Sequence, residues 1–128
     1  MKATIVTIGE SASVYEAAEK MKRAGVGSLL VEKAGEVKAI LTDADIIRKA
    51  VAERKMDGSV GSFASKPLVT IAADADLSDA AALMGRKGVK RLVVTSDGRV
   101  AGIVSQTDIV RISPSLYDLI AEHAGNNH

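Results

Sequence analysis

Residues 88–111, GVKRLVVTSDGRVAGIVSQTDIVR, have a counterpart at residues 25–48, GVGSLLVEKAGEVKAILTDADIIR. The similarity extends beyond these segments: residues 6–48 and 69–111 align without a gap at a constant offset of 63 positions, and 18 of the 43 aligned pairs are identical. A unit of this size is expected to be too small to bury its own apolar face, so the two copies should pack around a shared core. The sequence therefore predicts one domain of two related units, with two related clefts.

Each copy has the same order of expected elements: strand, helix, strand, strand and helix. Short β-branched runs at 6–8 and 69–71 begin the copies, and the capping residues Ser13 and Asp76 precede apolar residues at helical spacing. Two more strands follow in each copy, joined by a turn that contains glycine. These strands are expected at 28–32, 37–41, 91–95 and 100–104, the turns at Gly35 and Asp97-Gly98, and the helix C-caps at Gly25 and Gly88.

The chain is expected to form a single module, residues 1–128, of the mixed α/β (α+β) class. Its predicted segments are a first repeat at 4–55, a connector at 56–67, a second repeat at 68–113, and a C-terminal helix and tail at 114–128. The last helix of the first repeat should continue toward Lys55. Its counterpart should end early, because Pro114 cannot continue a helix.

Composition disfavours several classes of protein. The chain has 17 basic and 16 acidic residues, a net charge of +1, and its basic residues are scattered. A nucleic-acid surface needs clustered basic residues and often stacking aromatics, so no nucleic-acid partner is expected. The lack of cysteine excludes disulfides and thiolate chemistry. No apolar run reaches the roughly 18 residues of a membrane span and no signal peptide is recognised, so we expect a cytoplasmic protein without membrane contact.

Catalytic groups are scarce. The two histidines, His123 and His128, lie in the tail, so no serine or carboxylate of the repeats is expected to have an imidazole partner. They are also too few for a metal site, and no phosphate-binding loop of the Walker type is present. The sequence thus predicts no catalytic residues, no metal and no enzymatic activity.

One recurring pattern has two interpretations. Thr42-x-x-Asp45 and Ser105-x-x-Asp108 each follow a buried strand and open a helix. Hydroxyl and carboxylate at this spacing form a capping box, which alone explains both residues. Alternatively, the free amides and hydroxyl contact a phosphate, while the carboxylate accepts the hydroxyls of a ribose. Spacing alone favours the cap.

The closing segment GIVSQTDIV at 102–110 and the preceding GVKRLVV at 88–94 strongly resemble a CBS domain, and the two copies resemble a tandem CBS pair, or Bateman module, from about Thr4 to Arg111. This resemblance implies two pseudo-twofold-related β-α-β-β-α repeats packed through their sheets. It also implies clefts that bind AMP, ATP or another adenosyl ligand such as S-adenosylmethionine, and dimers that regulate a partner enzyme or transporter.

The resemblance also implies nucleotide-binding residues, each cleft drawing on both repeats. In the first cleft, Thr42 and Asp45 meet phosphate and ribose, and the cations Lys90 and Arg91 are directed at phosphate. In the second, Ser105 and Asp108 take the first pair of roles. The remaining residues of the first cleft are Ile40, Leu68, Val69 and Val89; those of the second are Thr4, Val6, Val26, Gly27, Ser28 and Ile103.

The resemblance therefore favours a regulatory module that binds adenine nucleotide as a ligand, uses no catalytic cofactor and signals to a protein that the sequence does not identify. The alternatives are a structural or dimerisation module with empty clefts, an S-adenosylmethionine binder, and a nucleic-acid binder. Because Gly27-Ser28 replaces Lys90-Arg91 in the second cleft, the cleft of Asp45 is expected to bind phosphate more tightly. A homodimer is also expected, because the helix faces with Ala17, Ala18 and Met21, and with Ala80, Ala81 and Met84, cannot all turn inward.

Overall fold

The computed structural model describes residue 1 and residues 3–64 and 68–125. The end of the predicted connector, at 65–67, and the end of the predicted tail, at 126–128, lie outside the described residues. The chain forms two compact units. The first unit is Ile5–Leu68, and the second combines Met1–Thr4 with the chain from Val69 onward.

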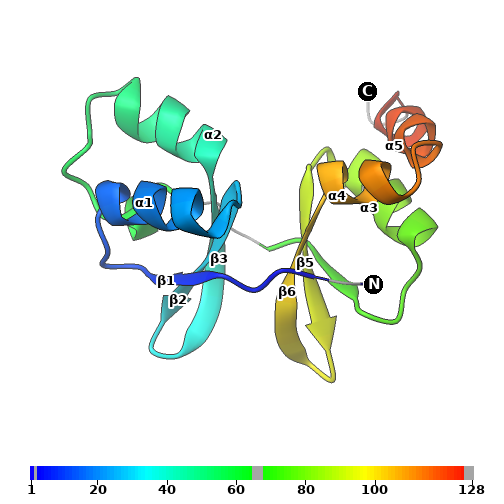
Figure 1. The fold of residues 1–128 in the computed structure, drawn as a ribbon, viewed down its shortest axis with the longest axis horizontal. Helices are drawn as coiled ribbons and strands as arrows, with labels where there is room; N and C mark the ends of the chain where they lie inside the picture. The colour runs from blue at the N-terminus through cyan, green and yellow to red at the C-terminus, as the bar shows by residue number, and fades with distance from the viewer. Residues whose placement is uncertain (2, 65–67, 126–128) are drawn as a thin grey trace. The chain divides into compact units, whose positions relative to one another are not determined.

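The first unit has a three-stranded sheet in the order β1-β2-β3 (Figure 1). Strand β1 is parallel to β2, and β2 is antiparallel to β3. Its elements are β1 (Thr7–Gly9), α1 (Val14–Ala24), β2 (Ser28–Lys33), β3 (Glu36–Thr42), α2 (Asp43–Asp45), the π-helix η1 (Ile46–Val51) and the 3₁₀ turn η2 (Val60–Ser62).

The second unit repeats this topology with a sheet in the order β4-β5-β6. Its elements are β4 (Thr70–Ala72), α3 (Leu77–Lys87), β5 (Arg91–Ser96), β6 (Arg99–Ser105), α4 (Gln106–Ile112) and α5 (Leu116–Gly125). The predicted element order and the α+β class are confirmed. Pro114 follows the end of α4, as expected of a residue that stops a helix.

Local turn chemistry explains why the strands meet in register. The β2–β3 turn places Ala34 and Gly35 at φ values of 53° and 80°, and the β5–β6 turn places Asp97 and Gly98 at 52° and 76°. Two successive positive φ values match a two-residue hairpin turn whose twist suits the flanking strands. The predicted C-caps are also confirmed, since Gly25 and Gly88 are left-handed.

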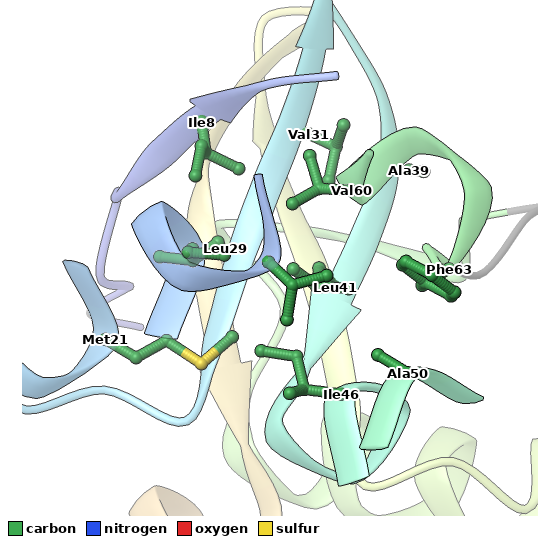
Figure 2. Packing of buried hydrophobic residues seen from close by; sticks show 12 residues of the cluster. Ile8, Met21, Leu29, Val31, Ala39, Leu41, Ile46, Ala50, Val60 and Phe63 are labelled. Atoms are coloured by element: carbon green, nitrogen blue, oxygen red, sulfur yellow. The ribbon is translucent and has the colours of Figure 1, made fainter. Parts of the chain in front are cut away.

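Each unit contains its own buried apolar cluster, so the expectation that neither copy buries an apolar face alone is wrong for the described residues. The reason is that each unit is larger than its repeat. Val60 and Phe63, from the predicted connector, join the cluster of the first unit (Figure 2). Ile120, from α5, joins the cluster of the second, and Met1 packs against it.

The chain's first residues belong structurally to the second unit. Thr4 forms an antiparallel bridge with Ile103, with N–H to carbonyl distances of 3.0 and 2.8 Å. The Met1 amino group donates to the Ala73 carbonyl at 2.8 Å. A Cβ at Gly102, whose φ is 150°, would lie 2.7 Å from the Thr4 carbonyl oxygen. Glycine at this position therefore lets the N-terminal segment pass alongside β6.

The last helix of the first repeat differs in type from its counterpart. Instead of a regular α-helix toward Lys55, the chain forms the short α2 and then η1, with π-type bonds from Ala52 N–H to Ile47 and from Lys55 N–H to Ala50. Apolar periodicity in the sequence does not separate these helix types. Single π turns are rare and frequently lie at functional positions.

Candidate functional site

The Thr42–Asp45 segment, called here the first corner, is where β3 ends and α2 begins. The Asp45 N–H donates to Thr42 Oγ1 at 3.1 Å, and the Thr42 N–H donates to Asp45 Oδ2 at 3.0 Å. These two bonds form a complete capping box. The neighbouring Asp43 carboxylate accepts from the Ala44 N–H at 2.8 Å.

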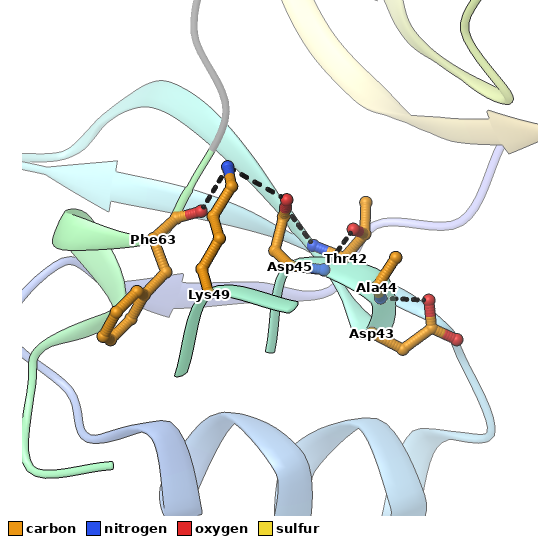
Figure 3. Close-up of polar contacts among 6 residues, drawn as sticks. All are labelled: Thr42, Asp43, Ala44, Asp45, Lys49 and Phe63. Carbon is orange, nitrogen blue, oxygen red and sulfur yellow. Dashed lines mark hydrogen bonds and ion pairs between the residues drawn. The ribbon is translucent and has the colours of Figure 1, made fainter. Parts of the chain in front are cut away.

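The Asp45 carboxylate also has a cationic partner. Lys49 Nζ lies 3.2 Å from Asp45 Oδ1 and donates to the Phe63 carbonyl at 3.2 Å (Figure 3). The Asp45 side chain is only 12% exposed. Lys49 is not among the site residues predicted from the sequence, although its position four residues after Asp45 is the helical spacing of an ion pair.

The Ser105–Asp108 segment, called the second corner, has the same capping box in a different environment. The Asp108 N–H donates to Ser105 Oγ and the Ser105 N–H donates to Asp108 Oδ2, both at 3.1 Å. Asp108 is exposed, and the repeat position of Lys49 is occupied by Ile112. Within the described ranges no cation forms an ion pair with Asp108.

Strand pairing determines which predicted residues adjoin each corner inside its own unit. Ser28 is paired with Thr42, and Arg91 with Ser105. The N–H of the next residue then donates to the carbonyl of the residue that precedes β2 or β5. Asp43 N–H donates to the Gly27 carbonyl at 2.9 Å, and Gln106 N–H donates to the Lys90 carbonyl at 2.8 Å. Gly27 and Ser28 thus adjoin the first corner, whereas Lys90 and Arg91 adjoin the second.

The other predicted residues lie on or beside the strands. Ile40 is paired with Leu30 inside the first sheet. The Val6 and Val69 carbonyls accept from the strands β2 and β5, and Ile103 is paired with Thr4 and Val93. The Val26 and Val89 N–H groups close the C-terminal turns of α1 and α3, and Leu68 is half-buried. The grouping of these residues across the two repeats comes from the resemblance alone.

Both interpretations of the recurring pattern remain open after this geometry. The capping bonds are present at both corners, so the hydroxyls and carboxylates have a structural role. That role uses one carboxylate oxygen in each case. A carboxylate oxygen has two lone pairs, so capping does not by itself prevent a second hydrogen bond.

An open cleft lies on the helical side of each corner. In the first unit a cleft of about 450 Å³ is lined by residues of α1 and by Asp43, Ile46 and Ile47. In the second unit a cleft of about 430 Å³ is lined by residues of α4 and by Tyr117.

Glu36 lies at the opposite end of β3 from the first corner. A hydrogen bond from the Lys38 side chain and the positive charge of Lys38 lower the pKa of the Glu36 carboxyl.

Neither a metal centre nor a membrane-spanning helix is found among the described residues. They contain no group of three or more histidine, cysteine, aspartate or glutamate side chains arranged to hold a metal ion. None of the described helices is long and apolar enough to cross a membrane.

Both repeats match one known domain family. Residues 1–52 and 60–115 match the CBS domain. MK0525 of Methanopyrus kandleri is 32% identical over 122 residues, covering 92% of this chain and 62% of that protein. The CBS domain-containing protein YhcV of Bacillus subtilis is 32% identical over 111 residues, covering 85% of this chain and 79% of YhcV. The chain spans only 29% and 45% of two relatives from Methanocaldococcus jannaschii.

A solved structure with the same fold contains a nucleotide. PAE2072 of Pyrobaculum aerophilum, a CBS domain protein complexed with AMP, superposes with a TM-score of 0.79 at 26% identity, over 94% of this chain and 95% of that one. Both repeats of this chain match the family, and their fold matches its solved members. The chain therefore belongs to the CBS-domain family, as a tandem pair of CBS repeats.

Proposed function

We propose that this chain is a regulatory module that binds AMP, ATP or a related adenosyl ligand and passes the binding signal to a partner protein. The observation that carries the proposal is the recurrence of the hydroxyl-x-x-aspartate corner in both repeats of a chain similar to the AMP-bound PAE2072 over nearly its whole length. No chemical step is assigned to the module.

The binding residues that we propose are those implied by the resemblance. The carboxylates of Asp45 and Asp108 accept ribose hydroxyls, and Thr42 and Ser105 contact phosphate together with nearby backbone amides. Lys90 and Arg91 supply positive charge for phosphate. The remaining lining consists of Thr4, Val6, Val26, Gly27, Ser28, Ile40, Leu68, Val69, Val89 and Ile103.

We further propose that the module is a cytoplasmic homodimer, on different grounds from those of the sequence. Ala17, Met21, Ala80, Ala81 and Met84 are buried, so these residues of the helix stripes provide no dimer surface. Support comes instead from exposed apolar side chains of the first unit: Tyr15 at 65%, Ile47 at 62% and Val51 at 51%.

A thermal-shift panel tests the binding proposal. AMP, ADP, ATP, adenosine and S-adenosylmethionine are each added at increasing concentration. A ligand at 100 times its Kd stabilises the folded state by about 2.7 kcal/mol, which raises the Tm of a domain of this size by roughly 10 °C. A rise with AMP or ATP supports the proposal, and a rise with S-adenosylmethionine alone changes the ligand. No rise with any of them favours the structural module with empty clefts.

A further inference from the structure

Lys49 joins two segments of the first unit that are separate in sequence. Its ammonium group contacts Asp45 Oδ1 in the first corner and the Phe63 carbonyl beyond η2, each at 3.2 Å (Figure 3). The Lys49 side chain is 44% exposed, whereas the Asp45 side chain is 12% exposed. In this ion pair, solvent therefore reaches the Lys49 side chain, whereas the Asp45 carboxylate is largely covered.

The Phe63 end of this contact is firmly held. Phe63 is 5% exposed and belongs to the apolar cluster of the first unit (Figure 2). A Cβ at Gly58 would lie 2.7 Å from the Phe63 ring, which shows how closely the chain packs there. The Phe63 and Ala64 N–H groups both donate to the Val60 carbonyl at 3.1 Å. The segment Val60–Ala64 is thus an ordered turn, with Lys49 bonded to one of its carbonyls.

The second unit provides an internal comparison. Ile112 stands at the repeat position of Lys49, is 68% exposed, and leaves the second capping box complete. The repeat therefore folds its corner without such a lysine. The Lys49 contacts are an addition specific to the first unit. Lys49 itself lies in the π-helical η1, whereas the equivalent position of the second unit lies in the α-helix α4.

We propose that Lys49 is a positioning residue that couples the Asp45 carboxylate to the turn Val60–Ala64, which comes before the second repeat in the sequence. A ligand hydroxyl that donates to Asp45 Oδ1 shares this oxygen with Lys49 Nζ, so ligand binding changes the Asp45–Lys49 contact even where the oxygen accepts both donors. Any change in the Asp45 contact then alters the lysine's bond to the Phe63 carbonyl. This ligand-dependent step rests on the proposed function, whereas the coupling itself does not.

Hydrogen exchange tests the coupling without ligand. The variants are Lys49→Met, Asp45→Asn and the double variant; Ile112→Met and Asp108→Asn are the matched controls in the second unit. Lys49→Met and Asp45→Asn should each raise the exchange rates of the Phe63 and Ala64 amides, relative to the core amide of Leu29, roughly two- to fivefold. The double variant should exceed neither single variant, and the controls should leave these amides unchanged.

The coupling is overturned if Lys49→Met leaves the exchange of Phe63 and Ala64 unchanged, or if the effects of the two single variants add. Normalising to Leu29 separates a local loosening from a loss of global stability, which accelerates both.

Addition of AMP tests the ligand-dependent step. Exchange at Phe63 and Ala64 should change on AMP binding in the wild type and stay constant in Lys49→Met, with binding in each followed by titration calorimetry. Calorimetric binding to the wild type without a change at these amides overturns that step. If the wild type gives no binding heat, the proposed function fails, and the exchange rates of the ligand-free variants still decide whether Lys49 couples the two segments.

Discussion

Asp45 and Asp108 show how one residue at equivalent repeat positions acquires different surroundings. Each carboxylate accepts the N–H of the hydroxyl residue three positions earlier, and this bond completes the capping box at the start of its own helix. Asp45 is also buried and paired with Lys49, whereas Asp108 is exposed. Breaking a partly buried ion pair costs more than removing an exposed charge, so the two corners are not interchangeable in energy.

At the scale of single residues, Lys90 and Arg91 beside the second corner lead to a prediction about nucleotide affinity. The double variant Lys90→Ala/Arg91→Ala should weaken AMP and ATP strongly and adenosine little, because a charge-assisted hydrogen bond contributes about 1.5–3 kcal/mol. Titration calorimetry with the three ligands measures this, and Lys38→Ala, a change in an exposed ion pair, is the control. An equal loss for adenosine would mean that the two residues shape the pocket without contacting phosphate. Repeating the titrations with Asp45→Asn and with Asp108→Asn would identify the corner that the cations serve.

At the scale of elements, helix α5 of the second unit has no counterpart among the described residues of the first unit. It packs against α3, and its Ile120 side chain is buried in the cluster of the second unit. Close approach of the two helices depends on Gly85. A Cβ there would lie 2.5 Å from the Ile120 carbonyl oxygen and 2.6 Å from the His123 Cβ. The first unit has Lys22 at the same repeat position, which is exposed.

Gly85→Ala should therefore destabilise the protein. Alanine is favoured over glycine within a helix by about 1 kcal/mol, but α5 must shift to admit the methyl group, and overpacking of this kind costs roughly 1–3 kcal/mol. We expect a net loss of stability in urea unfolding. Lys22→Ala at the matching position of α1 should change stability by no more than about 0.5 kcal/mol. A Gly85→Ala variant more stable than the wild type would show that α5 does not pack closely on α3.

At the scale of the whole molecule, the principal question is association. The cluster of the first unit accounts for the buried residues of its helix stripe. Tyr15, Ile47 and Val51 remain exposed, and so does Ala18, which follows Tyr15 by three positions. Exposed apolar side chains of this size favour burial against another surface. A second copy of the chain is the partner that we propose.

Light scattering at micromolar concentration should give twice the chain mass of 13.3 kDa. The variant Tyr15→Glu/Ile47→Glu should shift the mass to that of one chain, because burying two carboxylates without partners is strongly unfavourable. Arg99→Glu, on the exposed β5–β6 hairpin, is the control and should remain dimeric. A wild-type mass near 13 kDa at all concentrations would exclude the dimer.

Much of the fold was predictable because the interactions that specify it are local. The capping box of Thr42 and Asp45 joins residues three positions apart, and the turn at Asp97-Gly98 needs only two residues that tolerate positive φ. Because the two copies align at a constant offset, the sequence predicts each of these features a second time. The corners of the candidate site follow from the same local chemistry, so their positions were evident before the structure.

Tertiary structure alone decided the features that join distant parts of the chain. The Met1 amino group donates to the Ala73 carbonyl, 72 positions away, and Lys49 Nζ donates to the Phe63 carbonyl, 14 positions away. Helix α5 covers α3 because an apolar face there remains to be buried after the sheet has formed. Such contacts depend on which surfaces the local elements leave uncovered and on the space between them, as at Gly85 and Gly102. Residue spacing carries the short-range periodicity of elements but not these distances, so the two similar repeats acquire different surroundings.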